Sequence, residues 1–318
     1  MPERAEHAFA PAQKDDDFAA SVFDGLSRPL KSLPCRFFYD SIGSALFEEI
    51  TRQPEYYLTR AEIAILEANA PEMLGGELSG GILIEFGSGS SIKTEILIRL
   101  MPRLRAYVPI DISESALLEA KRRLTSRFPR LDVRPILGDF SHPVALPPEF
   151  ERLPKLGFFP GSTIGNFPPA EAAQMLRMMR LTLSSGGRLL IGVDLKKDAR
   201  QLVRAYNDAK GFTAAFNLNL LARINRELGG TFDLNAFRHR ATYEPLEGRI
   251  TMHLVSTKEQ AVELDGARIQ FSEGETIHTE SAYKYTIDEF RRVSRSAGWL
   301  PQRVWTDPDN LFSVRELV

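Results

Sequence analysis

A regular alternation of short apolar runs and helical segments between residues 82 and 193 constrains the fold more than any other feature. Five apolar runs are predicted to be strands, at residues 82–86, 107–110, 133–137, 156–159 and 187–193. The segments 93–100, 114–128 and 169–183 have the apolar spacing of helices. Strands that alternate with helices predict a parallel sheet with right-handed crossovers.

The pattern changes on both sides of this block. Residues 18–69 are predicted to be mostly helical, with interruptions at 39–43 and 54–57. After Asp198, the elements expected are helices at 202–208 and 215–227, antiparallel strands at 238–243, 249–255, 261–264 and 268–271, a helix at 287–297, and strand-like runs around Val304 and Phe312. We therefore expect an α/β, doubly wound domain that is interrupted by a second, α+β domain.

Composition and charge exclude several classes of function. The chain has 318 residues, of which 43% are hydrophobic and 26% charged, as in globular proteins with a substantial core. A net charge of -2 gives no basic surplus for nucleic acid or an anionic membrane. The sequence lacks a run of about 18 apolar residues, and its N-terminus lacks the apolar stretch of a signal peptide. We expect no nucleic-acid partner and no membrane association, and we expect residues 1–17 to form a flexible tail.

The cysteine and histidine content indicates neither disulfides nor a metal. Cys35 is the single cysteine, so an intrachain disulfide is impossible and a cytoplasmic location is expected. The four histidines after residue 100 are scattered without metal-ligand spacing, at His142, His239, His253 and His278. We therefore predict no metal cofactor.

Two glycines, Gly87 and Gly89, lie between the first predicted strand and the following helix. Glycines let the backbone turn sharply and bring its N–H groups close to a ligand beyond the carboxyl ends of the strands. Asp111 ends the second predicted strand, where a carboxylate can accept both hydroxyls of a ribose. Asp139 and Phe140 end the third, where they can bind an adenine amino group and pack on its ring.

These three strand ends together favour S-adenosylmethionine as the cofactor and transfer of its methyl group as the reaction. The rival class is a dinucleotide dehydrogenase, but the third glycine of that fingerprint would fall at Ile92. Lys93 opens the next helix. It is either a solvated surface lysine or a contact to the carboxylate of the cofactor's methionine moiety.

Several polar segments beyond the cofactor loop are candidates for substrate binding. Asn166 follows the fourth predicted strand, where an amide offers both a donor and an acceptor, although it could equally be a turn or cap residue before Pro168. Polar residues also cluster around Gly211, and this cluster has two interpretations: substrate binding, or helix capping and exposed helix faces. The residues are Tyr206, Thr213, Asn217 and Asn219. The charged segment 194–198 favours a solvated turn over a catalytic role.

A set of specific segments resembles one family along nearly the whole chain, from about Lys31 to the C-terminus. These segments are residues 38–44, 54–57, 161–167, 194–198, 212–217, 225–228 and 305–308. They are similar to the histidine-specific Nα-methyltransferases, which make trimethylhistidine (hercynine) in the first step of ergothioneine biosynthesis. The wider family also includes fungal enzymes that methylate indole amino acids.

The resemblance implies a Rossmann-like methyltransferase core with an inserted substrate domain. The implied core comprises residues 58–197 and 286–318, and the substrate-binding domain comprises 18–57 and 198–285. The cofactor positions of the family match Tyr39, Gly87, Lys93, Asp111, Asp139 and Phe140, to which the loop adds Gly89. The amino-acid positions match Tyr56, Asn166 and Tyr206, the residues predicted to be catalytic, and the imidazole pocket matches Met252 and Glu280. Thr213 is a further candidate for substrate binding.

One position departs from the family pattern. Alanine stands at Ala282, two residues after Glu280, where the histidine enzymes usually have a serine that binds the imidazole. Losing one hydroxyl partner costs about 1 kcal/mol or more. Glu280 still suits an imidazole N–H, so histidine stays the expected substrate.

Methyl transfer from a sulfonium needs an unprotonated amine in line with the methyl group and the sulfur. We expect Tyr56 to relay the amine's proton, and Asn166 and Tyr206 to hold the substrate carboxylate. Tyr39, Tyr56 and Phe216 can offer aromatic faces to the growing ammonium. The alternatives are N-methylation of another amino acid, such as an indole amino acid, and a non-catalytic regulator that binds S-adenosylmethionine. A monomer is expected.

Overall fold

The computed structural model describes residues 14–75, 80–87, 89 and 92–318. The chain divides into two compact units. The first contains residues 1–50, 209–241 and 251–280, and the second contains residues 51–208, 242–250 and 281–318. The domain boundaries inferred from the sequence stay a prediction.

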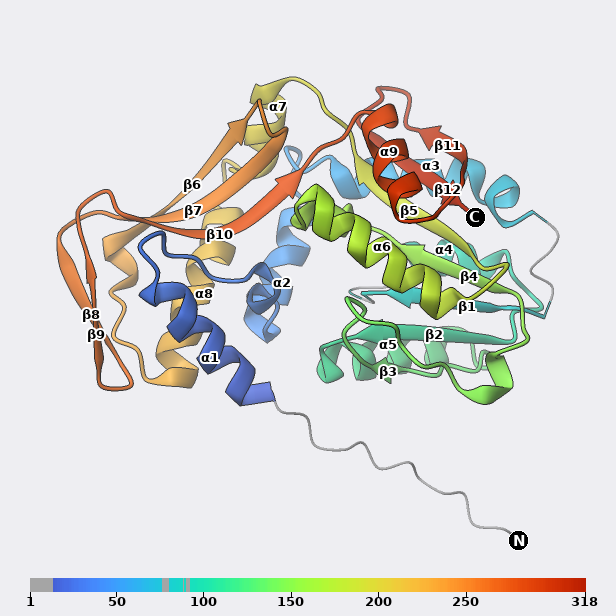
Figure 1. The fold of residues 1–318 in the computed structure, drawn as a ribbon, viewed down its shortest axis with the longest axis horizontal. Coiled ribbons are helices and arrows are strands. Elements are labelled where there is room, and N and C mark those ends of the chain that lie inside the picture. The colour runs from blue at the N-terminus through green and yellow to red at the C-terminus, as the bar shows by residue number, and fades with distance from the viewer. Residues whose placement is uncertain (1–13, 76–79, 88, 90–91) are drawn as a thin grey trace, which may run out of the picture. The chain divides into compact units, whose positions relative to one another are not determined.

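A seven-stranded sheet forms the centre of the second unit, in the order β11-β12-β5-β4-β1-β2-β3 (Figure 1). Its strands are β1 (Ile82–Phe86), β2 (Ala106–Asp111), β3 (Ile136–Leu137), β4 (Lys155–Phe159), β5 (Arg188–Asp194), β11 (Pro301–Thr306) and β12 (Phe312–Leu317). Strands β1 to β5 are parallel, whereas β12 is antiparallel to β5 and to β11. The five parallel strands predicted from the sequence are confirmed, and the third is shorter than expected.

Alternate residues of each central strand point to opposite faces of the sheet. Helices α6 (Pro169–Leu183) and α9 (Ile287–Ser296) cover one face, where Ile84 and Ile191 belong to the main apolar core. Helix α3 (Leu58–Leu74) contacts β5 and β12 on the other face. Gly192 lies under α3, because a Cβ atom there would lie 2.1 Å from Glu62 Oε1. Helices therefore cover both faces, as in a doubly wound α/β fold.

The remaining helices of this unit lie close to their predicted positions. They are α4 (Ile92–Arg99), α5 (Glu114–Arg127) and α7 (Ala199–Ala205). Helix α7 begins three residues before its predicted start because the Asp198 side chain accepts the backbone N–H groups of Arg200 and Gln201, at 2.9 and 3.1 Å. It also ends earlier, at Ala205, so Tyr206 follows it as the C-terminal cap.

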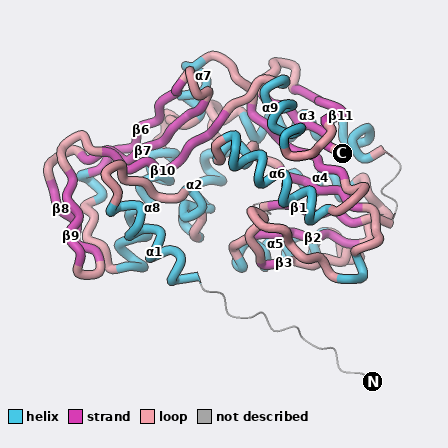
Figure 2. The backbone as a smooth tube through the Cα atoms, in the orientation of Figure 1, coloured by secondary structure: helices cyan, strands magenta, loops and turns pink. Residues whose placement is uncertain are grey.

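The first unit combines helices with strands (Figure 2). Its helices are α1 (Lys14–Ser27), α2 (Ser41–Thr51, which ends one residue beyond the unit) and α8 (Phe212–Leu228). The strands β8 (Gln260–Leu264) and β9 (Ala267–Phe271) form a hairpin, as predicted. A three-stranded sheet has the order β10-β7-β6, with strands β6 (Phe237–Glu244), β7 (Arg249–Ser256) and β10 (Thr276–Tyr283). One unit boundary falls within each of these three strands.

The structure corrects three details of the predicted secondary structure. Strand β10 was not predicted, because polar side chains such as Thr279 and Ser281 fill buried positions and hide the apolar alternation. Residues 28–40 are mostly non-helical, with only a short 3-10 turn at Cys35–Phe38. Helix α2 begins inside the interruption predicted at 39–43, because the Asp40 carboxylate accepts the Gly43 N–H at 2.6 Å.

Neither a membrane-spanning helix nor a metal site is found among the described residues. Within the residues that the structure describes, no helix is long and apolar enough to cross a membrane. Over the same residues, no group of three or more His, Cys, Asp or Glu side chains is arranged to hold a metal ion. The tail predicted for residues 1–17 lies outside the described residues up to residue 13, and helix α1 begins at Lys14.

Candidate active site

The glycine loop after β1 approaches the end of β2. Gly87 and Gly89 have φ angles of +77° and +38°, which residues with a side chain rarely adopt. The Gly87 N–H donates to the Ile110 carbonyl at 2.9 Å and so continues the parallel pairing of the two strands. A Cβ atom at Gly87 would lie 3.9 Å from the ring of Phe140. The loop predicted to bind the cofactor and the aromatic ring predicted to pack on adenine are therefore neighbours.

The two predicted acidic cofactor residues end adjacent strands. Asp111 is the last residue of β2 and is half-buried, and its Oδ1 accepts the Ser113 N–H at 2.8 Å. Asp139 is exposed and follows β3 by two residues. The Gly138 N–H donates to the Asp111 carbonyl at 3.0 Å, which joins the two strand ends. The structure thus brings the ends of β1, β2 and β3 together at one edge of the sheet.

Phe140 packs in an aromatic row at this edge. Its ring centroid lies 6.2 Å from that of Phe86 and 5.6 Å from that of Phe159, both in edge-to-face geometry. Phe86 ends β1 and Phe159 ends β4, so the ring of Phe140 rests against two further strand ends. This packing fixes an apolar, half-buried surface beside the glycine loop.

Glu85 is a buried acid directly behind the loop. It is 1% exposed, and the Tyr107 hydroxyl donates to its carboxyl group. Burial raises the pKa of Glu85 to about 8, although the Tyr107 hydrogen bond opposes the shift. The carboxyl group is therefore mainly protonated at neutral pH.

Lys93 is tied to the scaffold. Its ammonium pairs with Glu62 of α3, a carboxylate whose side chain is fully buried. The same carboxylate accepts the Gly161 N–H, with 2.9 Å between Gly161 N and Oε2. Glu62 thus connects the helix after the glycine loop to the loop after β4. Of the two interpretations of Lys93 from the sequence, the solvated surface lysine is therefore wrong.

The residues predicted to act on the substrate amine and carboxylate include two neighbouring tyrosines. Tyr56 and Tyr206 are both buried, and their ring centroids lie 6.3 Å apart in edge-to-face geometry. Asn166 is the last residue of a 3-10 turn (Thr163–Asn166) and is half-buried. In the same loop, the Ser162 Oγ accepts the Asp194 N–H at 2.9 Å, which anchors the loop to the end of β5.

The other predicted residues lie in the first unit, apart from Ala282. Tyr39 is partly exposed and its ring centroid lies 5.6 Å from that of Phe216, in edge-to-face geometry. Thr213 and Met252 are buried, so Thr213 does not lie on an exposed helix face. The Thr279 hydroxyl donates to the Met252 carbonyl at 3.1 Å, which fixes β7 against β10.

Glu280 and Ala282 occupy alternate positions of β10, so their side chains project from the same face of that strand. Glu280 is half-buried and Ala282 is buried. Burial and the nearby charge of Glu280 raise the pKa of the Cys35 thiol to about 12. Cys35 therefore remains a thiol at physiological pH.

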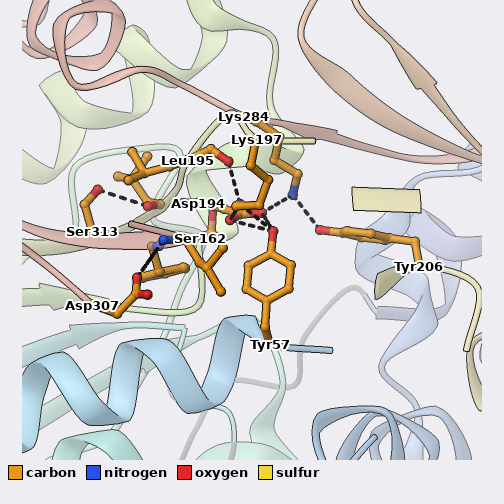
Figure 3. A network of polar contacts seen from close by, with 12 residues as sticks. Tyr57, Ser162, Asp194, Leu195, Lys197, Tyr206, Lys284, Asp307 and Ser313 are labelled. Atoms are coloured by element: carbon orange, nitrogen blue, oxygen red, sulfur yellow. Dashed lines mark hydrogen bonds and ion pairs between the residues drawn. The ribbon is translucent and has the colours of Figure 1, made fainter. Parts of the chain in front are cut away.

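A buried network at the end of β5 was missed by the sequence analysis (Figure 3). Lys197 and Lys284 contact Asp194 with Nζ–Oδ distances of 2.6 and 2.8 Å. The Tyr57 hydroxyl donates to the same carboxylate at 2.9 Å, and Lys284 Nζ donates to the Tyr206 hydroxyl oxygen at 2.8 Å. The solvated turn favoured for this segment is therefore wrong for Asp194 and Lys197, whose side chains are almost completely buried.

The pKa shifts of this network follow from its burial and its charges. Burial opposes ionisation of Asp194, but Lys284 and Lys197 outweigh it, so the pKa of this carboxyl lies below its usual value. Burial and Asp194 raise the pKa of Tyr57 well above its usual value, so this tyrosine is a neutral donor. Burial lowers the pKa of Lys197 to about 8, against the attraction of Asp194. The signal that could have identified the network is a strand that ends in aspartate three residues before a lysine.

Comparisons with known proteins place this arrangement in a class. A solved S-adenosylmethionine-dependent methyltransferase from Clostridium acetobutylicum superposes with a TM-score of 0.51 at 11% identity, over 85% of this chain and 96% of that one. The fold is therefore that of the Rossmann-like methyltransferases, and the α/β class predicted from the sequence is confirmed.

The family follows from the sequence comparisons. Residues 18–318 match the family described as "Histidine-specific methyltransferase, SAM-dependent". The chain is 40% identical to the "Histidine N-alpha-methyltransferase" of Mycolicibacterium smegmatis over 91% of both chains. It is 30% identical to "Ergothioneine biosynthesis protein 1" of Neurospora crassa over 87% of this chain and 32% of that longer one. The chain belongs to the family of histidine-specific methyltransferases that depend on S-adenosylmethionine.

Proposed function

We propose that this enzyme transfers methyl groups from S-adenosylmethionine to the α-amine of L-histidine, up to trimethylhistidine. The observation that carries the proposal is the 40% identity to a histidine N-alpha-methyltransferase over 91% of both chains. The similarity to a protein named for ergothioneine biosynthesis supports a role in that pathway. The resemblance found in the sequence pointed to the same activity.

The proposed cofactor site lies at the ends of β1, β2 and β3. Gly87 and Gly89 offer a turn without side chains. Asp111 is proposed to accept the ribose hydroxyls, and Asp139 and Phe140 are proposed to bind the adenine. Lys93 and Tyr39 are the remaining proposed contacts. Because Lys93 is already paired with Glu62, its contact to the cofactor's carboxylate would be shared with that pair.

The proposed substrate site has separate parts for the backbone and the ring of the amino acid. Asn166 and Tyr206 bind the α-carboxylate, and Tyr56 lies near the amine, in agreement with the short separation of the two tyrosine rings. Met252, Thr213 and Glu280 serve the imidazole, for which a carboxylate is a suitable acceptor of N–H. Ala282 occupies the position next to Glu280 on the same face of β10.

In the reaction the amine nitrogen attacks the methyl carbon and the carbon–sulfur bond breaks, which leaves S-adenosylhomocysteine. Orientation of the two reactants can supply roughly 7–11 kcal/mol of the barrier in favourable cases. The amine must lose its proton before attack, and we assign the relay of that proton to Tyr56. If Tyr56→Phe methylates histidine at the wild-type rate with saturating substrate, this role is excluded.

The second methylation and the third each leave a bulkier amine in the same site, and the last product carries a permanent positive charge. Aromatic faces attract such a cation. Tyr39 and Phe216 pack edge to face in one unit, and Tyr56 and Tyr206 do so in the other. We assign Tyr39, Tyr56 and Phe216 to this role.

A different amino acid is the second candidate substrate, and Ala282 is the observation that favours it. Alanine removes one hydroxyl partner of an imidazole at a buried position of β10. An indole has a single N–H and needs fewer polar partners.

Calorimetry in the presence of S-adenosylhomocysteine separates the two substrates. Histidine is expected to bind roughly tenfold more tightly than tryptophan, because the Glu280 carboxylate can form a charge-assisted hydrogen bond with a protonated imidazole, which an indole cannot offer. Equal affinities, or tighter binding of tryptophan, would exclude histidine as the preferred substrate. Tight binding of S-adenosylhomocysteine without turnover of any amino acid would instead indicate a regulator.

We further propose that the chain acts as a monomer in the cytoplasm. The single cysteine supports a reducing compartment. Light scattering at several protein concentrations tests the oligomeric state, and a mass that rises with concentration would contradict it.

A further inference from the structure

The hydroxyl of Tyr206 has a fixed hydrogen-bond polarity on the side that faces Lys284. Lys284 Nζ lies 2.8 Å from Tyr206 Oη, and the side chain of Lys284 is 1% exposed. An ammonium group has three donors and no acceptor, so the Tyr206 oxygen must be the acceptor of this bond. The proton of Tyr206 is therefore directed to a different partner, away from Lys284.

Lys284 is itself held from two directions. Its Nζ pairs with Asp194 Oδ2 at 2.8 Å, and its ammonium lies 4.7 Å from the centroid of the Tyr206 ring. The backbone next to it is fixed as well, because the Tyr285 N–H donates to the Asp194 carbonyl at 3.2 Å. The lysine therefore has little freedom to turn away from Tyr206.

The carboxylate that holds Lys284 is shared with other donors. Asp194 also accepts from Lys197 at 2.6 Å and from the Tyr57 hydroxyl at 2.9 Å. Two ammonium groups face this one buried carboxylate, so neither is fully neutralised by it. The carboxylate of Asp307, which is also labelled in Figure 3, accepts the Phe312 backbone N–H at 2.6 Å.

We propose that Lys284 is a positioning residue that makes the Tyr206 hydroxyl a polarised hydrogen-bond donor toward the substrate α-carboxylate, so that the site selects amino acids with a free carboxylate. This inference rests on the proposed function, in which Tyr206 binds that carboxylate. A donor polarised by a buried ammonium forms a stronger bond to an anion than to a neutral carboxamide. Lys284 contributes to substrate selection without being a catalytic residue.

The test compares histidine with histidinamide, in which a neutral carboxamide replaces the carboxylate. Wild-type enzyme is expected to prefer histidine in kcat/KM. In Lys284→Met, kcat/KM for histidine is expected to fall roughly tenfold or more, mainly through KM, while the value for histidinamide changes far less. The preference for the carboxylate therefore collapses in the variant.

Other outcomes separate this role from a purely structural one. An equal loss for both substrates, or no loss for histidine, overturns the proposal. Lys196→Met is the matched control, because Lys196 pairs with Glu289 outside the network, with 2.6 Å between the charged atoms. It is expected to keep the wild-type preference. Calorimetry with S-adenosylhomocysteine checks that each variant retains its cofactor site.

Two further variants cover the case in which Lys284→Met does not fold. Lys284→Gln keeps an N–H donor without the charge and is expected to lose part of the preference. Tyr206→Phe leaves the pair of Lys284 with Asp194 intact and is expected to lose the preference as fully as Lys284→Met, whereas a preference retained in Tyr206→Phe contradicts the proposal. If wild-type enzyme methylates another amino acid instead of histidine, the proposed function fails, and the same comparison is made with that amino acid and its amide.

Discussion

Aspartates follow several strands of the central sheet, and they differ most in how much water reaches them. Asp139 after β3 is exposed, and Asp111 at the end of β2 is half-buried. Asp194 at the end of β5 is completely buried and accepts from Lys197, Lys284 and Tyr57. The same residue type at the same edge of a sheet is thus accessible to a ligand in one place and committed to the scaffold in another.

Because these aspartates differ in solvent exposure, the position of a carboxylate after a strand does not by itself define its role. A half-exposed carboxylate keeps its affinity for a ligand's hydroxyl groups, because forming that bond costs little desolvation. A buried carboxylate is stable only if its protein partners satisfy it. The β5 end therefore acts on the substrate, in our account, through Tyr206 and not by direct contact.

The largest expected effect is on stability, from Asp194→Asn. This variant leaves Lys197 and Lys284 without their carboxylate, which should lower the free energy of unfolding by about 3–5 kcal/mol. Urea denaturation measures the change. Asp139→Asn, at an exposed position, is the matched control and should stay within about 0.5 kcal/mol of wild type. A loss below about 1 kcal/mol for Asp194→Asn would remove the contrast between the buried and the exposed carboxylate.

A smaller effect is expected on cofactor affinity, from Asp111→Asn. Loss of a charged acceptor for the ribose hydroxyls should weaken S-adenosylhomocysteine binding roughly 10–100-fold. Calorimetry measures this affinity. The control is Asp132→Asn, which alters an exposed ion pair with Arg134 and should leave the affinity unchanged. Equal affinities of Asp111→Asn and wild type would contradict the assignment.

Glu85 can be compared with Asp194, because it is also a buried acid but lies next to the glycine loop that is proposed to bind the cofactor. Its pKa is raised from 4.5 to about 8 by burial, so the folded state holds a proton that the unfolded state releases. Its contribution to stability is complete below pH 4.5 and is lost as the pH rises through about 8. In Glu85→Gln this pH dependence should disappear, a difference of a few kcal/mol between the two ends of this pH range. Urea unfolding across the window tests this, and parallel curves for both proteins would contradict it.

The smallest effect is expected from Ala282→Ser, which restores the serine usual in the histidine enzymes. One added hydrogen bond to the imidazole is worth about 1 kcal/mol, so the KM for histidine should fall several-fold. The preference for histidine over tryptophan should rise by the same factor. An unchanged or higher KM would show that the hydroxyl finds no partner at this buried position.

The sequence predicted the α/β fold well, because its strands are apolar runs that end in recognisable turn residues. The parallel strands and the helix α6 lie where the pattern placed them. Strand β10 escaped prediction because Thr279 and Ser281 occupy buried positions where an apolar residue is expected. The sequence of β10 therefore lacks the alternation of apolar and polar residues that would distinguish a strand from a loop.

The candidate site could be predicted only in part. The residues that resemble family positions were identified, and their roles stay predictions until ligands are bound. Only one part of the network around Asp194 has a signal in the sequence, the spacing of Asp194 and Lys197 at a strand end. Lys284 could not be predicted as a further member, because it lies 90 residues further along the chain than Asp194 and meets it only in the folded protein. A charged segment such as 194–198 is usually solvated. Only tertiary contacts reveal that the side chains of Asp194 and Lys197 are buried.

The most direct test of the account is product analysis with a panel of amino acids and S-adenosylmethionine, followed by mass detection. Histidine is expected to be converted to its mono-, di- and trimethylated forms, with S-adenosylhomocysteine released at each step. Tryptophan is expected to be methylated far more slowly. Efficient methylation of another amino acid with none of histidine would contradict the central claim.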